Sequence, residues 1–427
     1  MISNLVNNSC WLYIEPYVHI TLKNENVLLY NTVNGESIRY FNEPFIAALI
    51  KKLINKKNRW VLMIDEKTLS STTIQKFIDE IRNKFIGDII PTNWSNKKPF
   101  IFVPYPIINR KLGKQLNLPG KNKTLEYGNY LNEITLYINN LSIKEFYHYH
   151  ELYKQTTGYY SDNLLLKQLD LNLIENIFKK NKYIFLQKVN VAGGNILKHP
   201  VIINIVNYLN SLNLLISYFL PYSTLNYENI SSLNLINQNN SVLKIMFPAN
   251  VTFDIVFKSI TLLKNNKSKQ YFIFIIEDES KFEVIEKIIS ETGIEKHQII
   301  PYFNGTNIDF FKEMVYLDEQ TLLDLRQNQK KIFANSTLNQ LNFGHLTIIP
   351  NGNVFGNVNF PKSGNIKQQQ LIDCIFDELS NYKSWLKTRN KVNPCKNCIY
   401  QNLCPPLSDY ESIIKQHNLC NVFIEKP

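Results

Sequence analysis

The chain has 427 residues, of which 44% are hydrophobic and 19% are charged, and its formal net charge is +11. This composition excludes a disordered chain and predicts a globular protein with several domains. The basic residues are mostly Lys scattered among Asn, as at 179–182 and 264–267, so we expect no nucleic-acid partner. The longest apolar runs, Leu214–Leu220 and Tyr271–Ile276, are far shorter than the ~20 residues of a bilayer span, so we expect no membrane association and a cytoplasmic location.

Residues 1–88 are expected to form a small α+β domain. Short runs of β-branched and aromatic residues separated by turns predict strands, and apolar residues at helical spacing predict helices. The predicted strands are 17–22, 26–31, 37–40 and 60–64, and the predicted helices are 43–54 and 71–85. Residues 89–130 are rich in proline and predict a connector after this domain.

From residue 131 onward, predicted strands and helices alternate. The strands are Glu133–Ile138, Tyr183–Val191, Leu214–Phe219, Leu243–Phe247, Tyr271–Ile276 and Gln298–Tyr302. The helices are 163–180, 200–211, 222–233, 251–264, 279–292 and 307–328. This alternation predicts a parallel sheet with helical crossovers over residues 131–330, closed or partly closed into a barrel. We expect chemistry in the loops after the strands, because active sites in such sheets lie at the carboxyl ends of the strands.

The loop after the first of these strands, residues 139–153, is rich in His, Glu and Tyr. His148 and His150, with Glu145 nearby, are candidates for a metal site or an acid–base site. Imidazoles two residues apart lie on one side of a strand but not of a helix, so the local secondary structure decides whether they face each other. The aromatic residues of the loop, including Tyr147, favour a third interpretation, in which the segment packs into an internal space.

The loop after the second strand begins with Gly193, Gly194 and Asn195. Glycines allow the backbone to approach another group closely, so this turn is a candidate binding element. The sequence contains no Walker A loop, no G-x-S-x-G elbow, no H-E-x-x-H motif and no G-x-G-x-x-G motif. These absences leave the chain without a sequence motif for nucleotide binding or hydrolysis.

A third domain is expected at 341–427, after a linker at 329–340, and it begins with helices at 367–379 and 380–388. It contains four of the six cysteines of the chain, at the spacing C-x2-C-x5-C-x15-C: Cys395, Cys398, Cys404 and Cys420. A C-x2-C pair lets two thiolates converge from one turn, and the two later cysteines complete a tetrahedral zinc site or hold a [4Fe–4S] cluster.

Incidental thiols and two disulfides are the alternatives to a metal at these cysteines. We expect no secretory signal, and thiols in reducing compartments stay free, so the metal site is favoured. Residues 391–410 contain few apolar side chains. Metal binding is therefore expected to supply much of the local stability of the tail.

Together with the turn at 345–356 and the segment 363–366, these cysteines resemble the SPASM domain that ends many radical SAM peptide maturases. In that family, further cysteines in the turn and four positions after the third cysteine hold a second auxiliary cluster. This chain has no cysteine in the turn and has Ser408 at the other position. The resemblance therefore implies one surviving four-cysteine site, holding one [4Fe–4S] cluster or zinc.

The alternating strands and helices resemble the radical SAM core, a partial (β/α)6 barrel. That family places C-x3-C-x2-C after the first strand to hold the cluster that binds S-adenosylmethionine, and a Gly-Gly-Glu turn after the second strand. Here no cysteine occurs from 11 to 373, and the turn ends in Asn195. The resemblance thus implies a degenerate cofactor site that does not bind S-adenosylmethionine. Its residues are Tyr147, His148, His150, Gly193, Gly194 and Asn195.

Residues 1–88 resemble the RiPP recognition element, a winged-helix-like module that binds the leader of a ribosomally synthesised peptide. The resemblance implies that the leader adds a strand to an exposed sheet edge, with main-chain hydrogen bonds supplying affinity. The implied peptide-binding residues are Ser37, Ile38, Arg39, Tyr40, Phe45 and Leu49. A purely structural lid and a DNA-binding winged helix are the alternatives.

These features identify the chain as an α/β pseudo-radical-SAM protein with a leader-binding domain, a partial barrel and a SPASM-like cysteine domain. We interpret it as a non-catalytic partner that binds the precursor leader, or a true radical SAM peptide maturase, and presents the substrate. One alternative is an iron–sulfur electron-transfer partner. Another is an enzyme that uses acid–base chemistry at the former cofactor site through His148, His150 or Glu145.

Overall fold

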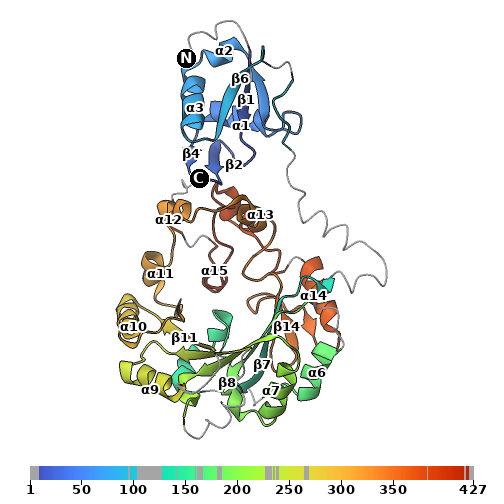
Figure 1. The fold of residues 1–427 in the computed structure, drawn as a ribbon, viewed down its shortest axis with the longest axis vertical. Coiled ribbons are helices and arrows are strands. Elements are labelled where there is room, and N and C mark those ends of the chain that lie inside the picture. The colour runs from blue at the N-terminus through green and yellow to red at the C-terminus, as the bar shows by residue number, and fades with distance from the viewer. Residues whose placement is uncertain are drawn as a thin grey trace.

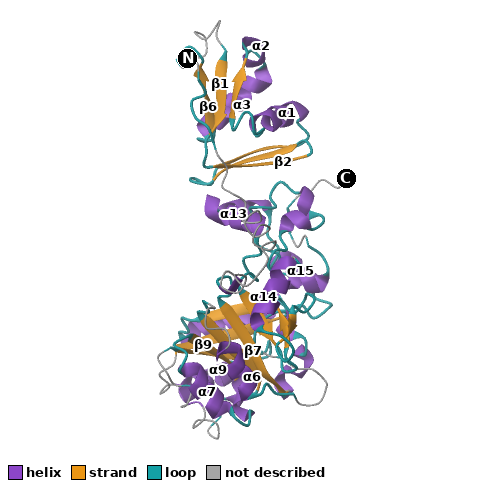
Figure 2. Cartoon of the chain, turned by 90° about the vertical axis from the view of Figure 1, so that its right-hand side faces the viewer, coloured by secondary structure: helices purple, strands orange, loops and turns teal. Residues whose placement is uncertain are grey.

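The computed structural model describes residues 9–94, 97–102, 127–141, 143–158, 160, 167–179, 185–226, 233, 236, 240–263, 269–381, 383–417 and 420–422. An N-terminal unit, a C-terminal cysteine region and a large sheet follow one another along the long axis of the molecule (Figure 1). The turned view places the N-terminal strands directly above the last part of the chain (Figure 2). The C-terminal region therefore lies between the N-terminal unit and the large sheet.

The N-terminal unit is built from two three-stranded antiparallel sheets. One contains β5 (Val61–Ile64), β1 (Cys10–Ile14) and β6 (Gly87–Pro91), and the other contains β2 (Val18–Lys23), β3 (Asn26–Asn31) and β4 (Ser37–Tyr40). The helices are α1 (Pro44–Leu53), α2 (Glu66–Leu69) and α3 (Thr72–Asn83). The strands and helices predicted here are confirmed. Strand β6 runs to Pro91, so the sheet extends past the predicted boundary at 88; most of the predicted connector lies outside the described residues.

Strand β3 is buried on both of its faces, which explains its unbroken apolar sequence. Successive side chains of a strand point to opposite faces. Val27 and Leu29 accordingly pack into the core of the N-terminal unit, whereas Leu28 and Tyr30 pack against the C-terminal region. The strand thereby joins the N-terminal unit to the C-terminal region through a second, separate hydrophobic cluster.

The large sheet has nine strands in the order β12-β11-β10-β9-β8-β7-β13-β14-β15. Its first part comprises β7 (Glu133–Leu141), β8 (Lys188–Gly194), β9 (Leu215–Pro221), β10 (Ser241–Phe247), β11 (Lys269–Ile276) and β12 (His297–Pro301). These strands lie side by side in chain order, and each is parallel to its neighbours. The predicted parallel sheet is confirmed.

Helices α6 (Leu171–Lys179), α7 (Ile202–Asn210), α9 (Phe253–Leu263) and α10 (Glu279–Thr292) lie along the outer side of this sheet (Figure 1). The last three confirm predicted helices. The helix predicted at 307–328 is divided into α11 (Ile308–Met314) and α12 (Glu319–Asp324). The described part of 163–180 becomes helical only from Leu171, and most of the predicted helix 222–233 lies outside the described residues.

The C-terminal region shares the large sheet. Strand β13 (His345–Ile348) pairs in parallel with β7, and β14 (Asn353–Phe355) and β15 (Gly364–Asn365) continue the sheet as antiparallel strands. Trp385, which is fully buried, belongs to the same hydrophobic core as the parallel strands. The sheet and its core therefore continue across the boundary predicted at 341.

Two predictions for the C-terminal part are wrong. The predicted linker at 329–340 contains helix α13 (Gln329–Thr337), because Asn328 caps it and Ile332 anchors it in the cluster that contacts β3. The helix predicted at 380–388 is absent from the described residues 383–388. Helix α14 (Leu371–Ser380) ends before them, and the Glu378 side chain accepts hydrogen bonds from the backbone N–H groups of Ser384 and Trp385. Helix α15 (Asp409–Ile414) lies between the third and fourth clustered cysteines.

Candidate functional site

The carboxyl ends of strands β7 to β10 are covered by the chain itself. Residues 144–149 and 152–154 form short 3-10 turns after β7, and their buried side chains pack on the inner face of the sheet. The resulting hydrophobic cluster contains, among others, Phe146, Tyr149, Leu152 and Tyr160 from this segment and Tyr137, Ala192, Phe219 and Met246 from the strands. The aromatic side chains of the loop therefore fill the internal space at this end of the sheet.

Two further contacts hold this segment in place. The ring centroids of Tyr149 and Tyr302 lie 4.9 Å apart in an edge-to-face arrangement, and the backbone N–H of Ala249 donates to the Tyr149 hydroxyl at 3.3 Å. The Gln155 side chain exchanges two hydrogen bonds of 2.8 Å with the backbone of Phe303. The loop after the first strand is thus tied to the last strands of the parallel sheet.

The polar residues predicted in this loop do not meet in a site. Tyr147 is 69% exposed, and the side chains of His148 and His150 also point to solvent. The turn conformation places Phe146 and Tyr149 inward and leaves the two imidazoles outside. These imidazoles therefore do not line a pocket in which they would share a bound metal ion or a proton-transfer partner.

The Gly-Gly turn closes against its neighbours at the end of β8. Gly193 has a φ of +126°, and a Cβ atom there would lie 2.3 Å from the backbone oxygen of Asn139. Its backbone N–H donates to Gly158 at 3.2 Å, and Asn139 Nδ2 donates to the backbone oxygen of Asn195 at 3.2 Å. The turn therefore contacts chain atoms where a cofactor would approach, and the residues at this end of the sheet do not fit S-adenosylmethionine or its cluster.

This packing predicts that Gly193→Ala is strongly destabilising. A left-handed backbone costs a residue with a Cβ about 1–2 kcal/mol, and overlap with the β7 backbone adds about 1–3 kcal/mol. Gly305 is the matched control, because its φ is +96° but a Cβ there would meet no atom within 4 Å. Scanning calorimetry should show a clearly larger fall in the unfolding temperature for Gly193→Ala than for Gly305→Ala. Equal falls would contradict the close approach to β7.

The four clustered cysteines line one cavity of about 210 Å³ between the C-terminal loops and the segment after α11. Cys395 is buried, and its thiol donates to the backbone oxygen of His417 at 2.7 Å. Burial raises the pKa of the Cys398 thiol to about 11, and it raises the pKa of Cys404 further. Without a metal, the thiols of Cys398 and Cys404 are therefore neutral at pH 7.

A buried ion pair lies against this cavity. Arg389 donates to the two carboxylate oxygens of Glu411 at 2.7 and 3.0 Å, and the two side chains are only 12% and 2% exposed. Glu411 also accepts a hydrogen bond from the backbone N–H of Ser408, which caps α15. Arg389 Nη1 lies 3.7 Å from the sulfur of Cys395. The guanidinium thus connects the last helix to the cysteine cavity.

The chemistry of the donor set fits a metal, since four thiols around one cavity match zinc or a [4Fe–4S] cluster. Among the described residues, no three His, Cys, Asp or Glu side chains are already arranged to hold a metal ion. The structure therefore brings the predicted cysteines together around a common space but does not display a formed coordination shell.

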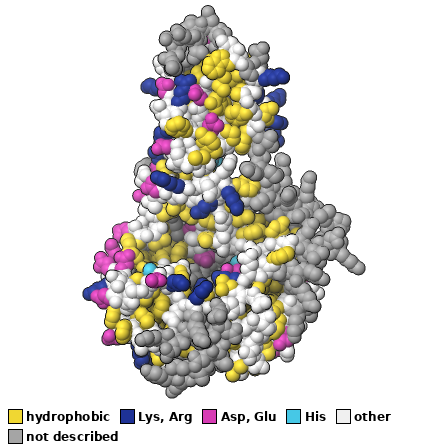
Figure 3. Space-filling view, viewed as in Figure 1, with side chains coloured by type: hydrophobic (Ala, Val, Ile, Leu, Met, Phe, Trp, Pro, Cys, Tyr) yellow, Lys and Arg dark blue, Asp and Glu magenta, His cyan; other side chains and the backbone are white. Residues whose placement is uncertain are grey.

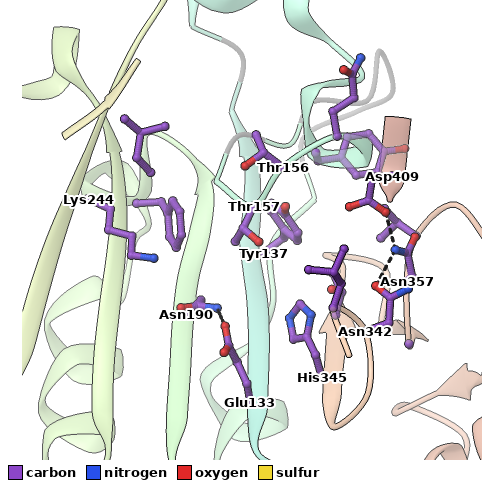
Figure 4. Close-up of a pocket in the computed structure, with 18 of the residues that line it drawn as sticks. Glu133, Tyr137, Thr156, Thr157, Asn190, Lys244, Asn342, His345, Asn357 and Asp409 are labelled. Carbon is purple, nitrogen blue, oxygen red and sulfur yellow. Dashed lines mark hydrogen bonds between the residues drawn. The ribbon is translucent and has the colours of Figure 1, made fainter. Parts of the chain in front are cut away.

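A larger cavity of about 330 Å³ lies on the inner face of the large sheet, and sequence reasoning missed it (Figure 4). Polar residues from the strands form one side: Glu133 of β7, Asn190 of β8, Lys244 of β10 and His345 and Thr347 of β13. Other lining residues include Tyr153, residues 155–157 and residues 342, 357 and 409. The sequence carried one signal of this cavity: the strands of a parallel sheet are usually apolar, whereas these strand positions are polar or charged.

Hydrogen bonds connect the polar residues at the base of this cavity. Glu133 Oε1 accepts from Lys188 Nζ at 2.9 Å and from Asn190 Nδ2. Asn190 Nδ2 also donates to Thr135 Oγ1 at 3.0 Å, and Thr135 Oγ1 lies 2.8 Å from His345 Nε2. Burial opposes ionisation of Glu133, but His345 and Lys188 outweigh it and keep the pKa of the carboxyl below its usual range.

The opposite side of the cavity presents Asp409 at the start of α15. Asn357 Nδ2 donates to its carboxyl at 2.5 Å, and Asn359 Nδ2 donates at 3.2 Å. Burial raises the pKa of Asp409 despite these two donors. Figure 4 shows Lys244 and Asp409 on opposite sides of the cavity, with Asn190 and His345 between them.

The residues predicted to bind a peptide lie in β4 and α1. Strand β4 is an edge strand, since it pairs only with β3 in the described part of its sheet. Ser37, Ile38 and Leu49 are buried, and Phe45 is 49% exposed. Arg39 reaches the C-terminal region and forms an ion pair with Glu319. Tyr40 turns toward α3, where its hydroxyl donates to Glu80.

Hydrophobic side chains gather on the face of the N-terminal unit that Figure 3 shows. Exposed apolar residues of this unit include Phe41, Met63, Phe85 and Trp94. No helix in the described parts of the chain is long and apolar enough to cross a membrane.

No protein-family model matches the sequence, and no curated protein matches it. Among solved structures, the chain is similar to Streptococcus suis SuiB bound to the precursor peptide SuiA, with 12% identity and a TM-score of 0.47 over 97% of this chain and 99% of that chain. SuiB alone gives 13% identity and a TM-score of 0.40 over 96% of this chain and 100% of that chain. SuiB bound to S-adenosylmethionine gives 12% identity and a TM-score of 0.43, again over 96% of this chain and 100% of that chain. At these identities and TM-scores, the likeness assigns no function to this chain.

Proposed function

We propose that this chain is a non-catalytic partner in the maturation of a ribosomally synthesised peptide. It binds the leader of the precursor and presents the peptide to a radical SAM maturase. The observation that carries the proposal is the aromatic packing over the carboxyl ends of β7 to β10, where enzymes with such sheets hold their reacting groups. In this proposal the parallel strands form a degenerate partial (β/α)6 barrel, between a leader-binding domain that ends near Pro91 and a SPASM-like domain at 341–427.

The edge of β4 is the proposed leader-binding surface. Asn31 N–H donates to the backbone oxygen of Glu36, so the alternation of an antiparallel ladder directs the backbone groups of Ser37 and Arg39 away from β3. Lys84 Nζ already donates a hydrogen bond to the backbone oxygen of Ser37 at 2.6 Å. The backbone of Arg39 therefore offers the main-chain hydrogen bonds by which a leader adds a strand.

Helix α3 forms the second side of this surface. The rings of Tyr40 and Phe77 lie 6.1 Å apart between their centroids, and the Tyr40 hydroxyl donates to Glu80. Phe41, which directly follows β4, is 43% exposed. A leader strand placed on β4 would thus have an apolar contact beside its main-chain pairing, and that contact supplies register.

A proline substitution tests this pairing. Arg39→Pro removes the backbone N–H on the free edge, where proline is tolerated because β3 does not use that group. We expect it to weaken binding of the precursor peptide encoded beside this chain at least tenfold in isothermal titration calorimetry. Arg39→Ala is the matched control, because it removes the same ion pair with Glu319 but keeps the N–H. Equal affinities of the two variants would show that the leader binds elsewhere.

The cysteine cavity is the proposed site of one [4Fe–4S] cluster or zinc, held by Cys395, Cys398, Cys404 and Cys420. Zinc would supply a structural crosslink of the tail, whereas a cluster would also supply one-electron transfer. Iron and zinc content after anaerobic purification distinguishes the two, because only the cluster gives iron, sulfide and a brown colour.

The whole proposal is tested by the mass of the precursor peptide after anaerobic co-expression. The peptide is expressed with this chain, with a neighbouring radical SAM maturase, and with both. We expect the modified mass only with both proteins. Modification by this chain alone would make it an enzyme, and equally efficient modification by the maturase alone would remove the presenting role. Either result would overturn the proposal.

A further inference from the structure

Lys244 carries an ammonium group without a carboxylate partner in the inner cavity. The side chain points from the middle of β10 into the cavity, and no Asp or Glu of the described residues forms an ion pair with it. Its Nζ lies 4.7 Å from the ring centroid of Phe219 and 5.6 Å from that of Tyr271. These rings supply part of the stabilisation that a cation needs, but they offer no hydrogen-bond acceptor of the strength of a carboxylate.

Glu133, the acidic strand residue of the cavity, forms no ion pair with Lys244. Glu133 is the nearest strand carboxylate in the cavity lining, and its Oε1 is already shared by Lys188 and Asn190. Burial is the main cause that lowers the pKa of Lys244, and the charge of Lys188 lowers it further; the charge of Glu133 opposes part of this shift, and the pKa is about 8. The ammonium is therefore mostly charged at pH 7, at a cost in stability that the two rings and the charge of Glu133 offset only in part.

The other side of the cavity has the opposite chemistry. Asp409, with Asn342 and Asn357 beside it, offers oxygen acceptors toward the cavity (Figure 4). A ligand that fits both sides carries an anionic group at one end and N–H donors at the other. The volume of about 330 Å³ is at the lower end of ligand pockets, so it holds a small group such as one side chain with its adjoining backbone.

We propose that this cavity binds an acidic residue of a peptide, with the side-chain carboxylate on Lys244 Nζ and backbone N–H groups directed to Asp409. The carboxylate follows from the unpaired ammonium. The choice of a peptide over a free amino acid rests on the proposed function. The cavity is then a second, short contact for the presented peptide, separate from the leader surface on β4.

The proposal sets the direction of a pH dependence. The titratable and charged groups around Lys244 are Lys188 on β8, Glu133 on β7, His345 on β13, Asp409 on α15 and the hydroxyls of Tyr137, Tyr153 and Tyr271. Burial lowers the pKa of His345, so this imidazole adds no competing cation above pH 7. Lys244 is charged below pH 8 and neutral above it. Affinity for a carboxylate should therefore be nearly constant between about pH 6 and 7, where the Glu side chain of the ligand is ionised, and fall about tenfold per pH unit above 8.

The test uses the full chain and a capped pentapeptide, acetyl-Gly-Gly-Glu-Gly-Gly-amide, with ligand-observed NMR. We expect its Gln counterpart to bind at least tenfold more weakly, because the charge-assisted hydrogen bond is lost. Lys244→Met should have the same effect and should abolish the pH dependence. Lys269→Met is the matched control, because Lys269 is exposed at the start of neighbouring β11 and outside the cavity.

A structural role for Lys244 predicts different results. Lys244→Met should raise the unfolding temperature of the ligand-free chain, since it removes a half-buried ammonium that has no ion-pair partner among the described residues; a lower unfolding temperature would overturn the proposal. Equal binding of the Glu and Gln peptides, unchanged binding in Lys244→Met, or no binding of the Glu peptide would also overturn it. Tight binding of free glutamate with weak binding of the peptide would overturn the choice of a peptide. None of these results affects the leader test on β4, which uses Arg39→Pro.

Discussion

Replacing Cys398 with serine should prevent binding of the proposed metal in the C-terminal region and unfold the loops around its site. Cys398 shares its cavity with three other thiols, and the surrounding loops contain few regular elements that would hold them without a metal. Structural zinc contributes about 10–16 kcal/mol to the folding of small zinc peptides, so the loss of one of four ligands is expected to remove most of the local stability. Metal analysis and limited proteolysis of the purified chain measure the two consequences.

The expected result is a metal content below one equivalent per chain and rapid cleavage within residues 391–410. Cys10→Ala is the control, because Cys10 is fully buried in the core of the N-terminal unit and lines no part of the cysteine cavity. It should leave the metal content unchanged. A Cys398→Ser chain that stays protease-resistant would show that packing, rather than a metal, holds the tail.

Replacing Arg389 with methionine should destabilise the same region by a different route. The variant leaves Glu411 charged in a position that is 2% exposed, and breaking a buried ion pair by removing one partner costs about 3–5 kcal/mol. Arg389 also donates to the backbone oxygens of Pro405 and His417, so these acceptors lose their donor. Hydrogen exchange should show strongly reduced protection of the backbone amides in α15 and in residues 395–404.

A double variant separates the charge from the packing. Adding Glu411→Gln removes the uncompensated charge, while the amide still offers an oxygen to the backbone N–H of Ser408. We expect Arg389→Met with Glu411→Gln to recover part of the lost protection. If the double variant is no better protected than Arg389→Met alone, the buried charge is not what destabilises the region. Metal content should be measured on both variants, because Arg389 lies beside Cys395.

Many regular elements of this chain could be predicted from local sequence, although β1, β6 and α2 were not. The strands β7 to β12 are short apolar runs between helical patterns, and their parallel pairing follows from the alternation because a parallel strand needs a crossover connection. The strands β2 to β4 follow from turn residues such as Asn34 and Gly35. The predicted linker at 329–340 failed because helix α13 has a low apolar content; its stability comes from the contact of Ile332 with β3.

Some residues of the candidate sites could also be predicted from local sequence, and others could not. The four cysteines were predictable because their spacing itself brings the thiols near one another. His148 and His150 were candidates from their residue types, but the 3-10 turn after β7 places them in solvent. The pairing of Arg389 with Glu411 carried no local signal: Ser408 and Glu411 form a capping-box pattern for α15, but nothing in the sequence near either residue indicates that Arg389 lies beside that helix.

The sequence alone determined the parallel sheet, the cysteine cluster and the absence of cysteines from the loop after the first strand, because each depends on neighbours in the chain. Only the tertiary structure decided what fills the inner face of the sheet. Glu133, Lys244, His345 and Asp409 come from four elements far apart in the sequence and meet in one cavity. Their meeting depends on which face each strand turns inward and on the pairing of β13 with β7, and these are set by packing of the whole sheet rather than by any local pattern.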